Sequence, residues 1–171
     1  VFANDWKGRR DLAVIALFYE TGIRLSELIG LNVEDMHTER GELRVIGKGS
    51  KERRIPLLPE TMKSIERHIE ERPYHSRHLF ITDAGRSLYA SFVYRRVRHY
   101  LSQVSSLKKT SPHILRHTFA THLLNNGAEL AAVKDMLGHA SLSSTQIYTH
   151  QSLARLKEVH AESPLDRRPK A

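Results

Sequence analysis

The sequence has no cysteine among its 171 residues. Disulfide bonds, cysteine-ligated zinc and thiol nucleophiles are therefore excluded. It also lacks any run approaching the ~20 apolar residues of a membrane-spanning helix. Its first residues show no charged segment followed by an apolar one, so we expect neither a membrane protein nor a signal peptide. With 40% hydrophobic and 27% charged residues, the chain suits one globular domain with a core of its own.

Acidic residues are in the minority. The 27 Lys and Arg against 19 Asp and Glu give a net charge of +8 and a pI of about 9.9. A basic surplus of this size on one domain attracts polyanions, so nucleic acid is the expected partner. A basic protein with no such partner is the alternative explanation. Basic residues gather at 48–54, 95–98, 108–109 and 167–170.

The N-terminal part predicts two helices. Four apolar residues at helical spacing indicate the first, with Asp5 as its N-cap and Gly22 just beyond its C-terminal end. A short second helix is predicted from Ser26. The residues expected to face the core from the first helix are Leu12, Ile15, Ala16 and Tyr19.

The pattern then changes to short runs rich in β-formers. Residues 42–46 and 53–57 flank a Gly-Lys-Gly-Ser-Lys segment at 47–51, which predicts an antiparallel hairpin. Residues 37–40, ending at Gly41, predict a third strand. The expected fold class is therefore mainly α with a small three-stranded antiparallel β-sheet.

Helical periodicity returns after the hairpin. Ser111 followed by Pro112 is typical of a helix start, with serine as N-cap and proline at the first helical position. Helices are predicted between Pro59 and Pro73, around 92–101, from 112 to about 125, and over 130–137, 141–148 and 152–161.

Several polar residues are suited to phosphate chemistry. His113 and Arg116 are three apart and share a helix face. An arginine presents a planar fork of donors to phosphate oxygens, and a histidine can move a proton near neutral pH. A solvated helix face explains such a pair equally well when it stands alone. Lys48, flanked by glycines, can carry a charge to a ligand from its turn, although turn lysines also protect sheet edges.

Three further residues have ordinary explanations when taken singly. His139 suits a helix C-terminus, Tyr148 a half-buried position and Arg24 the start of a helix. A metal site is not expected, because no His-Glu-x-x-His motif is present and a site of histidine plus arginine repels a dication. The histidines considered for it are His113, His117, His122, His139 and His150.

Four segments taken together resemble the catalytic domain of the tyrosine recombinases, the integrase family, and are most similar to its bacterial Xer-type members. They occur in the family's order and with about its spacing over residues 21–150. The segments are Thr-Gly-Ile-Arg-Leu-Ser-Glu-Leu at 21–28, Gly-Lys-Gly-Ser-Lys-Glu-Arg at 47–53, His-Ile-Leu-Arg-His-Thr-Phe-Ala-Thr at 113–121, and Leu-Gly-His at 137–139 with Thr-Gln-Ile-Tyr-Thr-His at 145–150.

The resemblance implies a complete functional set, with Tyr148 as the nucleophile. The implied catalytic residues are Arg24, Lys48, His113, Arg116, His139 and Tyr148. Phosphate contacts rather than catalysis are expected of Lys51, Arg53, Arg95, Arg96 and Lys108.

The domain organisation implied by the resemblance is a catalytic domain over residues 1–163. Residues 164–171, with two prolines and a basic cluster, predict a disordered tail. Family members also carry an N-terminal helical domain that completes a clamp around DNA. We expect this chain to lack that domain.

The implied activity is site-specific DNA recombination by strand cleavage and rejoining through a 3′-phosphotyrosyl intermediate, with no cofactor and no metal. The implied partners are double-stranded DNA and related protomers in a homo- or heterotetramer, and the helix at 152–161 packs on a neighbour or on its own core. A cytoplasmic location at the bacterial nucleoid is expected. The alternatives are a type IB topoisomerase, which uses nearly the same residues, a DNA-binding module that does not cleave, and a metal-dependent nuclease.

Overall fold

The computed structural model describes residues 2–104, 111–125 and, singly, 127, 129, 133 and 137; of Lys48 it describes the backbone only. Within these residues, no helix has the length and apolar character needed to cross a membrane. The elements are α1 (Trp6–Thr21), α2 (Leu25–Gly30), β1 (Met36–His37), β2 (Glu42–Ile46), β3 (Glu52–Pro56), α3 (Pro59–Glu71), α4 (Ala90–Val104) and α5 (Pro112–Asn125), with 3₁₀ turns at Val33–Asp35, Thr38–Arg40 and Lys48–Ser50.

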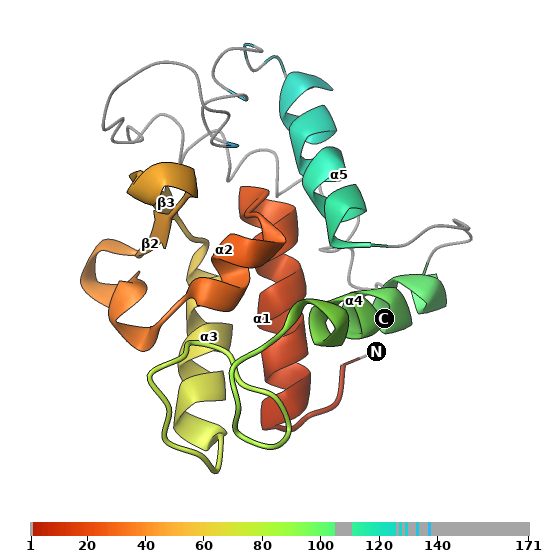
Figure 1. The fold of residues 1–171 in the computed structure, drawn as a ribbon. Helices are drawn as coiled ribbons and strands as arrows, with labels where there is room; N and C mark the ends of the chain where they lie inside the picture. The colour runs from red at the N-terminus through yellow and green to blue at the C-terminus, as the bar shows by residue number, and fades with distance from the viewer. Residues whose placement is uncertain are drawn as a thin grey trace.

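Helix α1 is the central element, with α3 beside it and α5 against its C-terminal end (Figure 1). Its predicted ends are confirmed. The Asp5 side chain accepts a hydrogen bond from the Gly8 N–H at 2.7 Å, and Gly22 ends the helix at φ +58°. The predicted core face is partly wrong, because Leu12 is 38% exposed. Neighbouring elements surround α1 on several sides, so its buried residues form a broad face: Ala13, Val14, Ile15, Leu17 and Phe18.

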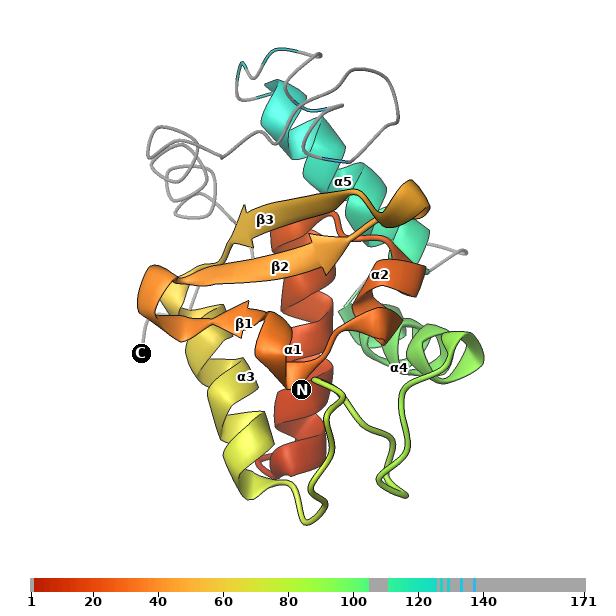
Figure 2. The same cartoon turned by 60° about the vertical axis from the view of Figure 1, so that its left-hand side comes forward.

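The sheet is three-stranded and antiparallel in the order β1-β2-β3 (Figure 2). The predicted hairpin is confirmed, with β2 as predicted and β3 shifted by one residue. Leu43 and Val45 alternate toward the core, as one face of a half-buried strand should. The predicted third strand is misplaced. The strand is Met36–His37, and Thr38–Arg40 forms the turn, because the chain must reverse there to pair His37 with Glu42.

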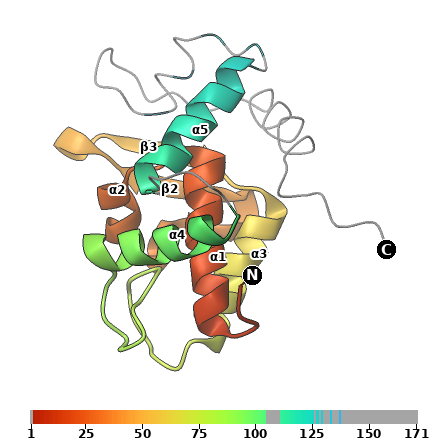
Figure 3. The same cartoon turned by 90° about the vertical axis from the view of Figure 1, so that its right-hand side faces the viewer.

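The later helices begin and end close to their predicted positions. Helix α3 starts at Pro59 and stops before Pro73, and α5 starts at Pro112. Helix α4 buries Val93, Val97 and Tyr100. Figure 3 shows α4 crossing α1, with α5 on the same side of the molecule. The helices predicted over 141–148 and 152–161 and the tail lie outside the described residues, as does the helix over 130–137 apart from the buried Val133 and Leu137.

A buried polar network fixes α4 on α1. Arg10 and Asp11 of α1 are each 1% exposed. Arg10 donates to Asp83 Oδ1 at 2.7 Å, and Asp11 Oδ2 accepts from Arg96 Nε at 2.7 Å and from the Tyr100 hydroxyl at 3.2 Å. Buried charges that are paired and hydrogen-bonded in this way set a defined geometry. The network therefore holds α4 in one position relative to α1.

Candidate active site

The turn after α1 brings Arg24 close to α5. Gly22 adopts the left-handed conformation, and a Cβ placed on it would lie 2.6 Å from Phe119 Cδ1 and 2.7 Å from Leu137 Cδ2. Only glycine therefore fits between α1 and α5 at this position. Two residues later Arg24 forms the N-cap of α2, so the close packing of the turn decides where its side chain begins.

Arg116 is anchored to the same turn from α5. Its Nη1 donates to the carbonyl oxygen of Gly22, and its Nη2 donates to the Leu137 carbonyl oxygen at 2.7 Å. Burial, together with the positive charges of Arg24 and Arg53, lowers the pKa of Arg116 to about 10. The guanidinium still carries its charge at neutral pH. Two arginines from separate helices are thus held together where an anion would stabilise both.

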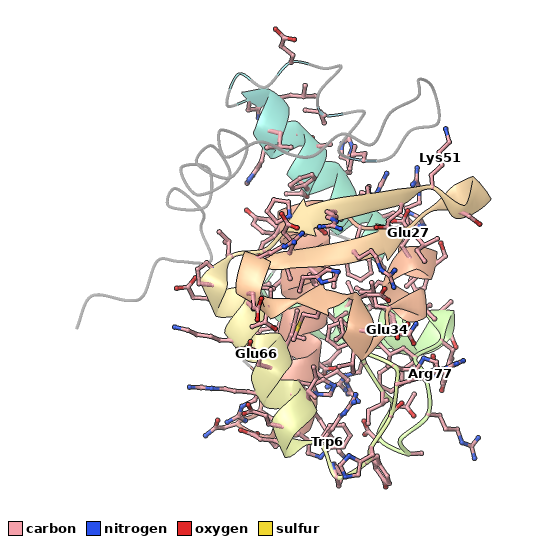
Figure 4. All side chains as sticks on the ribbon, turned by 90° about the vertical axis from the view of Figure 1, so that its left-hand side faces the viewer. Trp6, Glu27, Glu34, Lys51, Glu66 and Arg77 are labelled. Carbon is pink, nitrogen blue, oxygen red and sulfur yellow. The ribbon has the colours of Figure 1, made fainter. Side chains whose placement is uncertain are left out.

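Glu27, labelled in Figure 4, is the carboxylate that binds two of the arginines in this cationic cluster. Its Oε2 accepts from the Arg24 backbone N–H at 2.9 Å, and its Oε1 accepts from Arg24 Nη1 at 3.1 Å. Arg53 binds both carboxylate oxygens, each at 2.8 Å. Burial disfavours ionisation of Glu27, but the hydrogen bonds and charge of Arg53, with those of Arg24, hold its pKa below the ordinary value. Glu27 is therefore ionised and binds two arginines.

The β2–β3 hairpin approaches Glu27 at its tip. The Gly47 N–H donates to the Lys51 carbonyl at 2.8 Å and closes a turn in which Gly49 has φ +73°. A Cβ on Gly47 would lie 3.3 Å from Glu27 Oε1. The backbone of Lys48 therefore lies one residue from the point where hairpin and carboxylate meet. Lys51 is exposed and points away from the body of the domain (Figure 4).

A cavity of 520 Å³ connects α2, α5 and the start of α4. Arg24, His113 and Arg116 all line it, so the structure brings three of the six predicted catalytic residues to one cavity. His113 is exposed, and its ring lies 6.3 Å from that of Tyr94. The other lining residues are Phe18, Ile23, Leu25, Ser26, Ile29, Ala90 and Pro112.

Some of the remaining predicted residues are not described by the structure, and the others lie outside the cavity. His139, Tyr148 and Lys108 lie outside the described residues, and Lys48 is described by its backbone alone. Arg95 is exposed and donates to the Tyr89 hydroxyl at 3.1 Å.

Arg53 and Arg96 are bound to carboxylates of the protein itself. Arg53 is 13% exposed and paired with Glu27, whereas Arg96 is 35% exposed and lies 2.5 Å from Asp11 Oδ2. Asp11 raises the pKa of Arg96 above its ordinary value, although partial burial opposes the shift. Among the described residues, no group of three or more His, Asp or Glu is placed to hold a metal ion.

Glu27 is the site residue to which sequence reasoning gave no role. A signal for it exists in the Arg-Leu-Ser-Glu segment, because glutamate at the third helical position typically bonds back to the N-cap backbone. That bond is present. What the spacing does not indicate is Arg53, which reaches the same carboxylate from 26 residues further along the chain.

Comparison with known proteins agrees with this geometry. Residues 2–155 match the description "Phage integrase family". The chain belongs to the phage integrase family. It is 44% identical over 161 residues to tyrosine recombinase XerC of Chlorobaculum parvum, covering 88% of this chain and 48% of the relative. It is 43% identical over 161 residues to tyrosine recombinase XerD of Yersinia pestis, and the match covers 90% of this chain and 54% of that relative. The chain spans about half the length of the curated relatives it matches.

Solved structures of recombinases share the fold. The crystal structure of XerA recombinase superposes with a TM-score of 0.70 at 29% identity, covering 95% of this chain and 58% of that one. The structure of XerH site-specific recombinase bound to difH substrate, a pre-cleavage complex, superposes with a TM-score of 0.72 at 28% sequence identity. The match covers 95% of this chain and 49% of the XerH chain. The predicted fold class and the resemblance to Xer-type recombinases are both confirmed.

Proposed function

We propose that this chain is the catalytic domain of a tyrosine site-specific recombinase, which cleaves and rejoins double-stranded DNA through a 3′-phosphotyrosyl intermediate. The observation that carries the proposal is the placement of Arg24, Arg116 and His113 on one cavity. Membership of the phage integrase family and the XerH complex with difH DNA support it. The proposal assigns residues 1–163 to the catalytic domain.

The two arginines are proposed to bind the scissile phosphate. Negative charge gathers on the non-bridging oxygens in the transition state, and fixed donors in a partly buried site stabilise it without reorganisation. Arg116 is already fixed by two backbone carbonyls and Arg24 by Glu27, so both guanidiniums are oriented before DNA arrives. Removal of one such donor typically costs about 3 kcal/mol of transition-state stabilisation. His139 is proposed as a third donor.

Tyr148 is proposed to attack phosphorus. Its phenol has an unperturbed pKa of about 10, so the attack needs nearby cations or a base that takes the proton. His113, on the cavity, is the proposed base or orienting group. As the bond from tyrosine oxygen to phosphorus forms, the bond to the 5′-oxygen breaks. Lys48 is proposed to give that oxygen its proton.

The product retains the energy of the phosphodiester. The tyrosine oxygen replaces the 5′-oxygen on phosphorus, so the 5′-hydroxyl of a second strand can reverse the step without ATP. Exchange of strands between two duplexes requires four active sites, and we propose a homo- or heterotetramer on DNA. A cytoplasmic location at the bacterial nucleoid is part of the proposal, because the proposed substrate is double-stranded DNA.

The proposed phosphate contacts outside the cavity are the exposed Lys51 and Arg95, together with Lys108. Arg96 can join them through the 35% of its side chain that remains exposed, although Asp11 already binds it. Contacts of this kind position DNA and make its affinity salt-dependent. Arg53 is 13% exposed and uses both Nη atoms on Glu27, which favours a different role.

A covalent trap tests the proposal. The protein is incubated in EDTA with nicked duplexes that carry a randomised core, and Tyr148→Phe is the matched control. We expect an SDS-stable protein–DNA adduct that maps to Tyr148 through a 3′-phosphate. Relaxation of supercoiled DNA by a monomer would indicate a type IB topoisomerase instead. DNA binding with no adduct, from this chain and from a longer one that extends it at the N-terminus, would favour a non-cleaving module.

A further inference from the structure

Arg53 is placed by the sheet directly beside the hairpin that carries Lys48. It lies on β3 opposite Val45 of β2, so the strand register fixes its distance from the turn at Gly47. Both Nη atoms donate to the Glu27 carboxylate, each at 2.8 Å, and the side chain is 13% exposed. Such a paired fork fixes orientation as well as distance.

The same carboxylate also binds Arg24. Glu27 accepts from the Arg24 backbone N–H at 2.9 Å and from its Nη1 at 3.1 Å, while a Cβ on Gly47 would lie 3.3 Å from Glu27 Oε1 and 3.6 Å from Arg53 Nη1. Arg24 and the base of the hairpin therefore share one anchor. A shift of Arg53 would move the turn of Lys48 relative to Arg24.

We infer that Arg53 is a positioning residue, which docks the Lys48 turn on Glu27 and so sets where Lys48 delivers its proton relative to the phosphate bound by Arg24. The inference rests on the proposed function. It assigns Arg53 a different role from that of Lys51, whose exposed side chain is available to phosphate. The Arg53 side chain is 13% exposed and bound to Glu27, so it presents little surface to a DNA phosphate.

The test compares two leaving groups. Once the adduct experiment has mapped the cleaved position, duplexes are made with either oxygen or sulfur as the bridging 5′ atom. A thiolate is a much weaker base than an alkoxide and departs without a proton, so the sulfur substrate does not need the general acid. We expect Lys48→Ala and Arg53→Lys each to slow cleavage of the oxygen substrate about 10²-fold. Both should return close to the wild-type rate on the sulfur substrate.

Matched variants separate positioning from other effects. Arg54→Ala removes the neighbouring arginine, which is 42% exposed and lies 3.7 Å from Glu42, and it should cleave both substrates like the wild type. Arg53→Lys keeps a cation beside the buried carboxylate and so protects folding. Arg53→Met, whose side chain has similar reach without charge, is the second variant and should show the same rescue by sulfur.

Several outcomes would overturn the inference. An equal loss of rate on both substrates would place Arg53 in phosphate binding or general stability. Weaker DNA binding with a reduced salt dependence would identify it as a phosphate clamp. A wild-type adduct without rescue of the Arg53 variants refutes the positioning role alone. Absence of an adduct from both the wild-type chain and a longer one refutes the proposed function and this inference with it.

Discussion

Two titratable groups, the partly buried Glu20 and the buried His68, should give the stability of this domain opposing dependences on pH. Glu20, in the last turn of α1, accepts a hydrogen bond from the Thr61 hydroxyl, and the backbone N–H of Leu58 also stabilises its carboxylate. Burial raises its pKa to about 7. His68 lies between Trp6 and Phe80, with ring centroids at 5.9 Å and 5.7 Å. Burial lowers its pKa to about 4.

The sign of each effect follows from which state binds more protons. The folded state holds the Glu20 proton more tightly than the unfolded chain, so its stabilisation is complete below pH 4.5 and is lost as the pH rises through 7. The unfolded state holds the His68 proton more tightly, so its stabilisation is present above pH 6.5 and is lost as the pH falls through 4. At 1.36 kcal/mol per pKa unit, each effect amounts to about 3 kcal/mol. The two slopes nearly cancel between pH 4.5 and 6.5.

Glu20→Gln removes the pH dependence of stability that comes from Glu20 and leaves the one that comes from His68. We expect the free energy of unfolding of Glu20→Gln, relative to wild type, to rise by about 3 kcal/mol between pH 4 and pH 8. His68→Phe should show the opposite change, a relative loss of about 3 kcal/mol between pH 4 and pH 7. Urea unfolding at fixed ionic strength across this range measures both, and titrations common to all three proteins cancel in the differences. If the free energies of unfolding of Glu20→Gln and wild type changed in parallel with pH, the raised pKa of Glu20 would be refuted.

Three further predictions concern the site. Gly22→Ala should lower the free energy of unfolding by at least about 2 kcal/mol, since φ is +58° and the new Cβ would lie 2.6 Å from Phe119 Cδ1. Urea unfolding measures this change, and an unfolding midpoint equal to that of the wild type would contradict the close packing at Gly22. Arg116→Lys should keep the fold but slow adduct formation about 10²-fold or more, because a lysine cannot reproduce the fork; near-normal rates would contradict its role. Lys51→Ala should lower the salt slope of DNA binding by about one unit, whereas Arg96→Ala should mainly reduce stability through the unpaired Asp11.

Local signals explain what could be predicted from the sequence. Three predicted features depend on residues that are close in the sequence, and all three are present in the structure. They are the N-cap at Asp5, the helix start at Ser111-Pro112 and the glycine-flanked hairpin. The core face of α1 could not be predicted in the same way. Burial of a central helix depends on which elements surround it, and this is decided by packing between distant parts of the chain.

Which charged residues pair with each other could not be predicted from the sequence either. Arg96 and Asp11 are 85 positions apart, and Arg53 and Glu27 are 26 apart. A basic cluster at 95–98 or 48–54 predicts an affinity for polyanions but does not reveal which of its members the fold binds internally. Those assignments needed the three-dimensional arrangement. The proposed catalytic set comes from the resemblance to the tyrosine recombinases, since each of its residues has an ordinary explanation alone.

The charge of the described site gives a reason for the burial of Glu27 among arginines in a site that we propose binds a phosphodiester. Arg24, Arg53 and Arg116 carry three positive charges and Glu27 one negative charge, which leaves a net +2. A phosphodiester is monoanionic before attack and becomes a dianionic phosphorane when phenolate oxygen adds to it. A cluster of +2 therefore complements the transition state better than the ground state, which is the condition for raising the rate rather than the affinity. Loss of Glu27 would add positive charge, strengthen ground-state binding of DNA and release Arg24 from its fixed orientation, so tighter binding with slower cleavage is the expected signature of Glu27→Gln.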